Sequence, residues 1–236
     1  MTAAAAPPPA AGVMVLLLAR CRSGAVPWAL SRLVLGRRGL GRVDGLRFAR
    51  VLGSGRGGGF GIVPSLHHHG LVGFFDDEDS AHRFVDSSPA AAAYRAHADE
   101  FACGVLRATA SRGSWGGATL AVTATATPGE RCAALTRASI RPRWARRFWG
   151  HTPTTGHDLA AARGCRLAVG LGEAPIVRQA TFSVWDDTAA MEAYARQGAH
   201  RDAAAGAWRE RWFSEWMFVR LKPLRLEGRW HGTALA

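Results

Sequence analysis

The stretch GLGEAPIVRQATFSVWDD, from Gly170 to Asp187, contains the pattern that decides the fold. Apolar and polar residues alternate along ATFSVW, as in a strand with one buried face, and the run ends in two aspartates. A helix-like segment begins at Thr188 and carries His200 in the motif GAHRDA. Aspartate is a preferred residue at a helix N-terminus, so the pattern predicts a strand that leads directly into a helix.

The first half of the chain contains a looser copy of this pattern. Phe75–Asp77 aligns with Trp185–Asp187, and Gly45–Arg47 aligns with Gly164–Arg166. Each half reads as strand, helix, strand, strand, helix, strand, which is the order of the ferredoxin-like βαββαβ unit. Because the aspartate pairs recur at the same structural place, we expect them to cap helices rather than to form a catalytic pair.

These elements predict an α+β protein of two tandem ferredoxin-like units. The bare sheet faces of the units are expected to pack together, sheet to sheet, in a sandwich or barrel-like core. The expected divisions are a disordered Ala/Pro-rich N-terminus at 1–12, a first unit at 13–117, a linker at 118–131 and a second unit at 132–232. A chain of 236 residues is long enough to bury a sizeable core.

The chain is strongly basic, with 30 Lys and Arg against 18 Asp and Glu and a formal charge of +12. Such a surface favours anionic partners, among them acidic membranes and acidic electron-donor proteins, or is simply solvated. Its arginines are scattered rather than clustered with aromatic residues, which argues against nucleic-acid binding. The apolar run Val13–Ala19 is too short to cross a bilayer, which needs about 20 residues. We therefore expect a cytoplasmic protein.

The four cysteines form no CxxC pair, and each lies in or beside an apolar run. This spacing disfavours a zinc site or a disulfide framework. Buried, reduced thiols are the expected state.

His200 is the first candidate for chemistry. Ala203, Ala204 and Ala207 follow it on the same helix face. A face of small residues lets a flat ligand lie close to the helix, with the imidazole available to an iron. Residue types alone favour the plainer interpretation, a partly buried histidine over an alanine-rich packing face. His97 lies in the corresponding helix of the first half and is the competing axial ligand.

Two other motifs are weaker. Neighbouring residues of His67–His69 would point to opposite faces of a strand, so a solvated strand edge explains them better than a metal site. The run Gly53–Phe60, GSGRGGGF, contains a formal GxGxxG match, but no helix opens after it, so its context is wrong for a dinucleotide site. It is either a solvent loop or a flexible lid near a ligand.

Four segments together resemble a known family. GLRFARVLGSGRGGGF, LTRASIRPRWARRFW, GLGEAPIVRQATFSVWDD and YARQGAHRDAAAGAWRERWFSEWMFVRLKPL are similar to the spheroidene monooxygenase family, the acyclic carotenoid ketolases. The similarity runs from about Val13 to Gly232. It implies kinship with the dimeric α/β-barrel superfamily, in which tandem ferredoxin-like units often hold haem.

The resemblance implies a haem-dependent monooxygenase that uses molecular oxygen and reduced ferredoxin. Its members hydroxylate and then ketolate the end group of an acyclic carotenoid such as spheroidene. His200 matches the family's histidine in GAHRDA and is the expected haem-iron ligand and catalytic residue, with His97 as the alternative. Buried propionates favour arginine forks, for which Arg178, Arg201 and Arg209 are candidates.

Two further expectations follow from the resemblance. An apolar carotenoid would enter from a membrane, so peripheral association with the inner face of the membrane is expected. An acidic ferredoxin would be attracted to the basic surface. The alternative to an enzyme is a non-catalytic haem- or polyene-binding protein on the same tandem barrel.

Overall fold

The computed structural model describes residues 12–174, 176–196, 201 and 206–235, with the backbone alone at 151–157, 160 and 174. The N-terminus that we expected to be disordered, 1–12, therefore lies outside the described residues except for Gly12. Within the described ranges, no helix has the length and apolar character that crossing a bilayer requires.

The first half follows the predicted order of strands and helices. Its elements are β1 (Val13–Cys21), η1 (Ser23–Ala25), α1 (Val26–Leu35), η2 (Gly36–Leu40), β2 (Leu46–Gly55), η3 (Arg56–Gly58), β3 (Pro64–Phe75), α2 (Glu78–Ser87), α3 (Pro89–His97) and β4 (Ala98–Gly113). Pro89 separates the two helices because it lacks the N–H that a continuous helix needs, yet suits the first position of a new one.

The second half repeats this order. Its elements are β5 (Cys132–Ile140), η4 (Pro142–Trp144), α4 (Ala145–Ala161), β6 (Cys165–Ala174), β7 (Arg178–Trp185), α5 (Thr188–Ala195), β8 (Phe213–Trp230) and β9 (Thr233–Ala234).

Eight strands form one closed antiparallel sheet. The order β4-β1-β3-β2-β6-β7-β5-β8 closes into a ring because β8 also pairs with β4, and the short β9 pairs with β8. The two halves thus meet edge to edge, and of the two expected cores, sandwich or barrel-like, the chain forms the barrel. One seam, β4–β8, is long, whereas β2 and β6 pair only through Gly53 with Gly172 and Ser54 with Leu171.

The aligned triplets of the two halves have the same local structure. The Asp76 N–H donates to the Gly45 carbonyl at 2.9 Å, and the Asp186 N–H donates to the Gly164 carbonyl at 2.8 Å. Both glycines have a positive φ, a conformation that glycine adopts without strain. An arginine two residues after each glycine pairs with the aspartate of the same half. The sequence alignment of these triplets is therefore confirmed in space.

The second aspartate of each pair caps a helix, as predicted. The Asp77 carboxylate accepts from the Ser80 N–H at 2.7 Å, and the Asp187 carboxylate accepts from the Ala190 N–H at 2.7 Å. The Ser80 N–H lowers the pKa of Asp77 below its usual range and outweighs the small opposing effect of burial.

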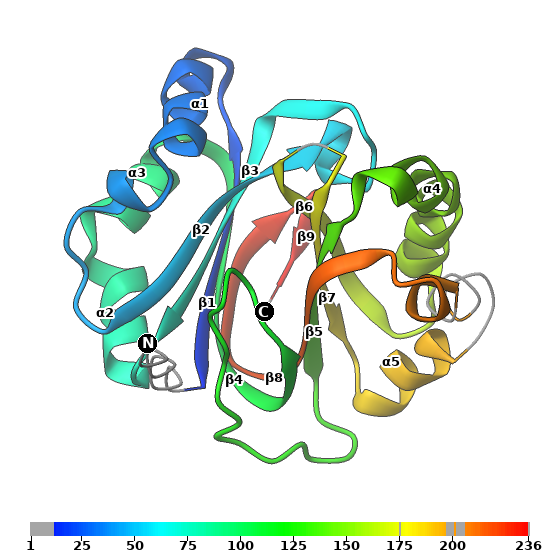
Figure 1. The fold of residues 1–236 in the computed structure, drawn as a ribbon. Coiled ribbons are helices and arrows are strands. Elements are labelled where there is room, and N and C mark those ends of the chain that lie inside the picture. The colour runs from blue at the N-terminus through cyan, green and yellow to red at the C-terminus, as the bar shows by residue number, and fades with distance from the viewer. Residues whose placement is uncertain (1–11, 175, 197–200, 202–205, 236) are drawn as a thin grey trace, which may run out of the picture.

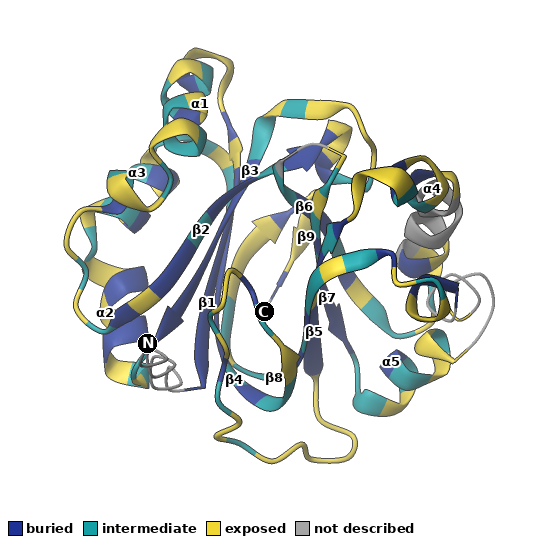
Figure 2. Ribbon diagram, viewed as in Figure 1, coloured by how far each residue is buried: buried dark blue, intermediate teal, exposed yellow. Residues whose placement is uncertain are grey.

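Alternate residues of all eight ring strands fill the barrel interior with one hydrophobic cluster. The helices lie outside the barrel, with α1, α2 and α3 on the flank of the first half and α4 and α5 on the flank of the second (Figure 1). Figure 2 shows the buried strands at the centre and the exposed residues on the outer sides of the helices. Cys21, Cys103 and Cys132 are buried and unpaired, as predicted, and Cys165 is half-buried.

The expectation of a solvated strand edge at His67–His69 is wrong. These residues belong to β3, which lies between β1 and β2, and His69 is only 1% exposed. Burial lowers the pKa of His68 to about 4, with the nearby charge of His231 acting in the same direction. A run of polar histidines suggests solvent exposure in the sequence. The pairing of β3 with both β1 and β2, which buries His69, cannot be read from the sequence.

Candidate functional site

The outer face of the sheet differs between the two halves. In the first half, a single hydrophobic cluster joins all four strands to α1, α2 and α3. Its strand residues Val15, Leu17, Leu71, Phe75 and Val105 have no exposed surface. The helices of the first half therefore seal the sheet beneath them.

In the second half, two smaller and separate clusters lie on the corresponding face. One gathers around Leu159, Trp185 and Met191, at the end of the sheet where β7 leads into α5. The other gathers around Ile140 and Trp149, at the opposite end of β5. Among the side chains that the structure describes, no single cluster covers this face.

Small side chains lie between the two clusters. The pairing of β6, β7, β5 and β8 aligns Gly170, Thr181, Thr136 and Phe218 in one row across the sheet. Thr136 is exposed although it lies in the middle of β5, and Thr181 and Phe218 are half-buried. We call this row, with the rows on either side of it, the second-half floor. The neighbouring rows are Gly172, Gln179, Ala138 and Trp216 on one side and Ala168, Ser183, Ala134 and Arg220 on the other.

The glycine-rich loop after β2 covers one edge of the second-half floor. Phe60 packs on the cluster around Trp185, and the Gly59 carbonyl oxygen lies 2.6 Å from the position that a Cβ on Gly170 would take. The loop is therefore packed against β6. Gly59 and Phe60 are therefore not part of a plain solvent loop, and the role of a lid near a ligand stays a prediction.

His200 lies outside the described residues, so its role as an iron ligand stays a prediction. Described aromatic residues before and after it contact the outer face of the second half. The ring of Tyr194 lies 5.5 Å from that of Trp185, and the ring of Trp208 lies edge-on at 4.6 Å from that of Trp216. Described residues before and after His200 in the sequence therefore contact this face.

The three arginines predicted to bind propionates differ in where they lie relative to the second-half floor. Arg201 and Arg209 belong to the segment after α5, and both are exposed. Arg178 is exposed at the start of β7, where it alternates in register with the interior residues Ala180 and Phe182. Its side chain therefore leaves the strand on the side opposite to the second-half floor.

His97 lies on the sealed half. Its ring stacks on that of Trp28 with the centroids 4.2 Å apart and the planes 3° from parallel. Its Nδ1 lies 2.8 Å from the Ala93 carbonyl oxygen. One face and one ring nitrogen of this competing ligand are thus already engaged.

Sequence reasoning missed a buried ionic network at one end of the barrel interior. The Arg137 side chain, 4% exposed, donates to Glu173 at 3.0 Å and to Glu215 at 2.5 Å. Glu173 also accepts from Arg50 Nε at 2.6 Å and from Trp115 Nε1 at 2.9 Å. The charges of two arginines and two glutamates therefore compensate one another at this end of the barrel interior.

The network also sets the charge state of Glu215. Burial alone would raise its pKa, but the Gly117 N–H and the Arg137 charge outweigh burial and hold the pKa below its usual range. Two sequence signals pointed to this network without identifying it. Arg137 interrupts the apolar strand CAALTRASI at an inward position, and Glu173 is the charged residue of GLGEAP.

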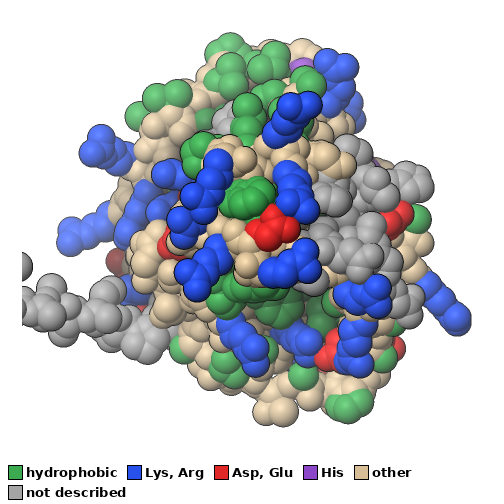
Figure 3. Space-filling model, turned by 45° about the vertical axis from the view of Figure 1, so that its right-hand side comes forward, with side chains coloured by type: hydrophobic (Ala, Val, Ile, Leu, Met, Phe, Trp, Pro, Cys, Tyr) green, Lys and Arg blue, Asp and Glu red, His purple; other side chains and the backbone are tan. Residues whose placement is uncertain are grey.

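The surface of the second half is rich in arginine. Figure 3, which brings the right-hand side of Figure 1 forward, shows basic side chains around small hydrophobic patches. The segment before and within the start of α4 contributes Arg141, Arg143, Arg146 and Arg147, all exposed. Such a surface attracts an acidic protein or an anionic membrane.

Comparison with known proteins identifies relatives of this chain. It is 48% identical over 220 residues to the spheroidene monooxygenase of Rubrivivax gelatinosus, across 93% of this chain and 85% of that protein. It is 34% identical over 214 residues to the spheroidene monooxygenase of Rhodobacter capsulatus, across 89% of each. No protein-family model matches.

One solved structure with a similar fold is an aldoxime dehydratase in complex with butyraldoxime. Its TM-score is 0.59 at 12% sequence identity, over 89% of this chain and 79% of that chain. At this identity the likeness concerns the fold alone.

Proposed function

Because the chain belongs to the spheroidene monooxygenase family, we propose that it is a carotenoid monooxygenase. The proposed reaction hydroxylates and then ketolates the end group of an acyclic carotenoid, with molecular oxygen and electrons from reduced ferredoxin. The observation that carries this proposal is the 48% identity across 93% of the chain. Haem is the cofactor that the family resemblance implies.

The second-half floor fits a flat prosthetic group. Thr181 and Thr136, beside the loop that covers Gly170, present no side chain larger than threonine, and Thr136 is open to solvent in the middle of a sheet. An apolar cluster borders this stretch at each end. On the corresponding sheet face of the first half, bulky buried residues occupy this position.

We assign the residues of the chain around that group as follows. His200 would hold the iron, in preference to His97, because described residues on either side of His200 contact the outer face of the second half. Arg201 and Arg209 would hold the propionates, and Arg178 has the weaker claim because it points away from the floor. Bound haem would supply the activation of molecular oxygen.

Besides lying against the prosthetic group, the side chains of the floor would bind an apolar substrate. The half-buried rings of Trp216 and Phe218 offer apolar surface beside Thr136. A polyene lying on these rings is shielded from water on one side. The exposed arginines before α4 attract an acidic ferredoxin or an anionic membrane surface, so peripheral attachment at the inner face of the membrane suits the proposed substrate.

The same proposal includes the finer description of the fold. We infer two tandem ferredoxin-like units, 13–117 and 132–232, joined by a linker at 118–131. Support comes from the strand orders β4-β1-β3-β2 and β8-β5-β7-β6, which are equivalent, and from the matching triplets at Gly45 and Gly164.

Absorption spectroscopy of the purified protein, expressed with a haem supply, tests this function. We expect a Soret band that shifts on reduction with dithionite and again with carbon monoxide. His200→Ala should lose the band while the far-UV circular dichroism is retained, and the matched variant His97→Ala should keep it. Full haem occupancy in His200→Ala would rule out the assigned ligand.

Turnover separates the enzyme from a carrier. With ferredoxin, its reductase and oxygen, the protein should convert spheroidene to hydroxylated and ketolated products. A protein that shows the haem bands but converts no carotenoid would instead be a haem- or polyene-binding protein.

A further inference from the structure

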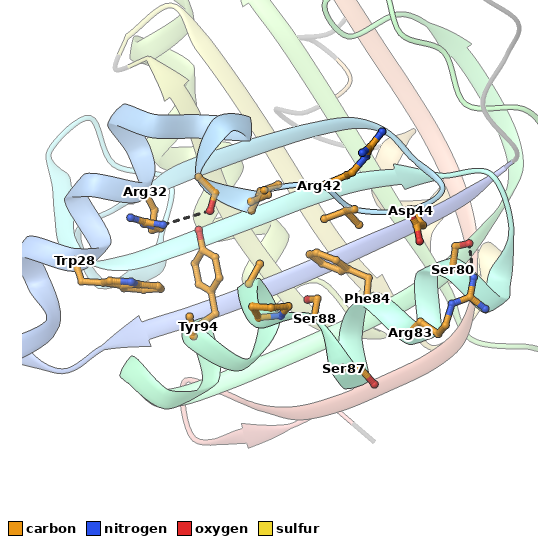
Figure 4. Close-up of a pocket in the computed structure, with 17 residues that line it drawn as sticks. Trp28, Arg32, Arg42, Asp44, Ser80, Arg83, Phe84, Ser87, Ser88 and Tyr94 are labelled. Carbon is orange, nitrogen blue, oxygen red and sulfur yellow. Dashed lines mark hydrogen bonds between the residues drawn. The ribbon is translucent and has the colours of Figure 1, made fainter.

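The first half contains a cavity of about 570 Å³ that the proposed reaction does not use (Figure 4). It lies between α1 and η2 on one side and α2 and α3 on the other. Trp28, Leu40 and Phe84 supply much of its apolar wall. A space of this size is typical of sites for small molecules.

Tyr94 contributes a buried hydroxyl to this cavity. The residue is 1% exposed, and its Oη has no hydrogen-bond partner among the described residues. Burial raises the pKa of Tyr94, so the group remains a protonated donor at neutral pH. A buried hydroxyl without an acceptor is costly, and a ligand oxygen would remove that cost.

Positive charge exceeds negative charge around the same cavity. Arg32, Arg42 and Arg83 line it together with one carboxylate, that of Asp44. Across the described part of the chain, none of the three arginines forms an ion pair. Arg32 donates instead to its neighbour Ser31 and to a backbone carbonyl, and Arg83 donates to a serine hydroxyl.

Polar groups lie at both ends of the cavity, with Tyr94 and Arg32 at one and Arg42, Asp44 and Arg83 at the other, and Phe84 lies between the two ends (Figure 4). Figure 4 shows the Tyr94 hydroxyl directed toward Arg32, with Phe84 further along the same space. A molecule that fits needs an anionic oxygen at the Arg32 end and an apolar body along Phe84 and Leu40. An uncharged apolar molecule would leave the Tyr94 hydroxyl without an acceptor and the Arg32 charge without a counter-charge.

We propose that this cavity binds an amphipathic carboxylate of the fatty-acid class. Its carboxylate accepts a hydrogen bond from the Tyr94 hydroxyl and faces the Arg32 guanidinium. Its hydrocarbon chain packs on Phe84 and Leu40. This site is separate from the second-half floor and does not depend on the proposed haem.

Isothermal titration calorimetry of the full chain with decanoate tests the proposal. We expect saturable binding of one decanoate, and binding of the neutral analogue decanol at least about tenfold weaker, since it lacks the charge-assisted contact. Tyr94→Phe should weaken decanoate binding by about tenfold, the loss expected for one hydrogen bond to a charged group. Tyr194→Phe is the matched control, because Tyr94 and Tyr194 are the only two tyrosines of the chain.

A second variant tests the space itself. Ala93 lies in α3 and lines the cavity, so Ala93→Leu should fill part of it without removing a polar group or disfavouring the helix. We expect this variant to keep the thermal unfolding midpoint and lose decanoate binding. The proposal is overturned if wild-type protein binds no decanoate, if decanol binds equally well, or if Tyr94→Phe and Ala93→Leu both retain wild-type affinity.

Discussion

Replacing Arg137 by methionine removes the centre of the buried network inside the barrel. The variant deletes the bonds to Glu173 and Glu215 and leaves two carboxylates that burial partly shields from water. Removing one partner of a buried ion pair typically costs about 3–5 kcal/mol. Glu173 keeps Arg50, and Glu215 keeps the Gly117 N–H, so we expect a loss near the lower limit, about 3 kcal/mol.

The chain offers a matched surface control for this variant. Arg166 pairs with Asp186 at 2.5 Å, as Arg137 does with Glu215, but its side chain is 63% exposed. Arg166→Met should therefore cost only about 0–1 kcal/mol. Urea unfolding of both variants measures the difference. A loss below about 1 kcal/mol for Arg137→Met, equal to that of the control, would refute the view that burial makes this network matter.

The pH dependence of stability gives a second readout of the same network. The pKa of Glu215 is lower in the folded protein than its ordinary value of 4.5. A carboxylate with a lowered pKa contributes stability above the unfolded pKa, and the contribution is lost as pH falls through the folded value. Wild-type protein should thus lose stability below about pH 4.5, and Arg137→Met should show a flatter profile in that range.

Three other predictions concern the two halves separately. Asp77→Ala and Asp187→Ala should each lower the free energy of unfolding by about 1 kcal/mol, because both remove a helix cap, and unequal losses in thermal unfolding would contradict the repeat. Burial raises the pKa of Cys165 to about 11, so iodoacetamide at pH 8 should modify it slowly until urea unfolds the chain. Gly170→Ala should lower the unfolding midpoint because its Cβ would lie 2.6 Å from the glycine-rich loop, whereas Gly24→Ala, with open space, should not.

The sequence predicts the bounds of a strand well where the strand coincides with one mainly apolar run. The sequence predicts strands at Val13–Cys21 and Cys132–Ile140, because each is a mainly apolar run followed by an arginine, and both agree with the bounds of β1 and β5. The sequence predicts Phe101–Ala108 and Trp216–Leu224 as the last strands of the two halves, and both are much shorter than β4 and β8. Their polar extensions become strands because they pair with each other, and this pairing depends on how the halves meet.

The candidate site was less accessible to sequence reasoning for the same reason. Thr136 is an ordinary strand residue until the register places it between the half-buried Thr181 and Phe218. Arg137 and Glu173 are 36 positions apart, and their contact depends on β5 and β6 flanking β7 in the sheet. By contrast, the family motif around His200 was visible in the sequence, although that segment lies outside the described residues.

The unequal seams of the barrel bear on how the protein folds and opens. Along β4 and β8, pairing runs, with two register shifts, from Ala102 with Gly228 to Gly113 with Met217. By contrast, β2 meets β6 at two residue pairs, a Ser54 hydroxyl bond and the Arg50–Glu173 ion pair. A ring opens where the fewest contacts hold it, so local unfolding should begin at the β2–β6 junction while β4–β8 acts as a hinge. Backbone amides at the short junction should accordingly exchange with deuterium before those of the long one. The barrel is therefore not equally stable around its circumference, and the glycine-rich loop lies beside the short β2–β6 junction.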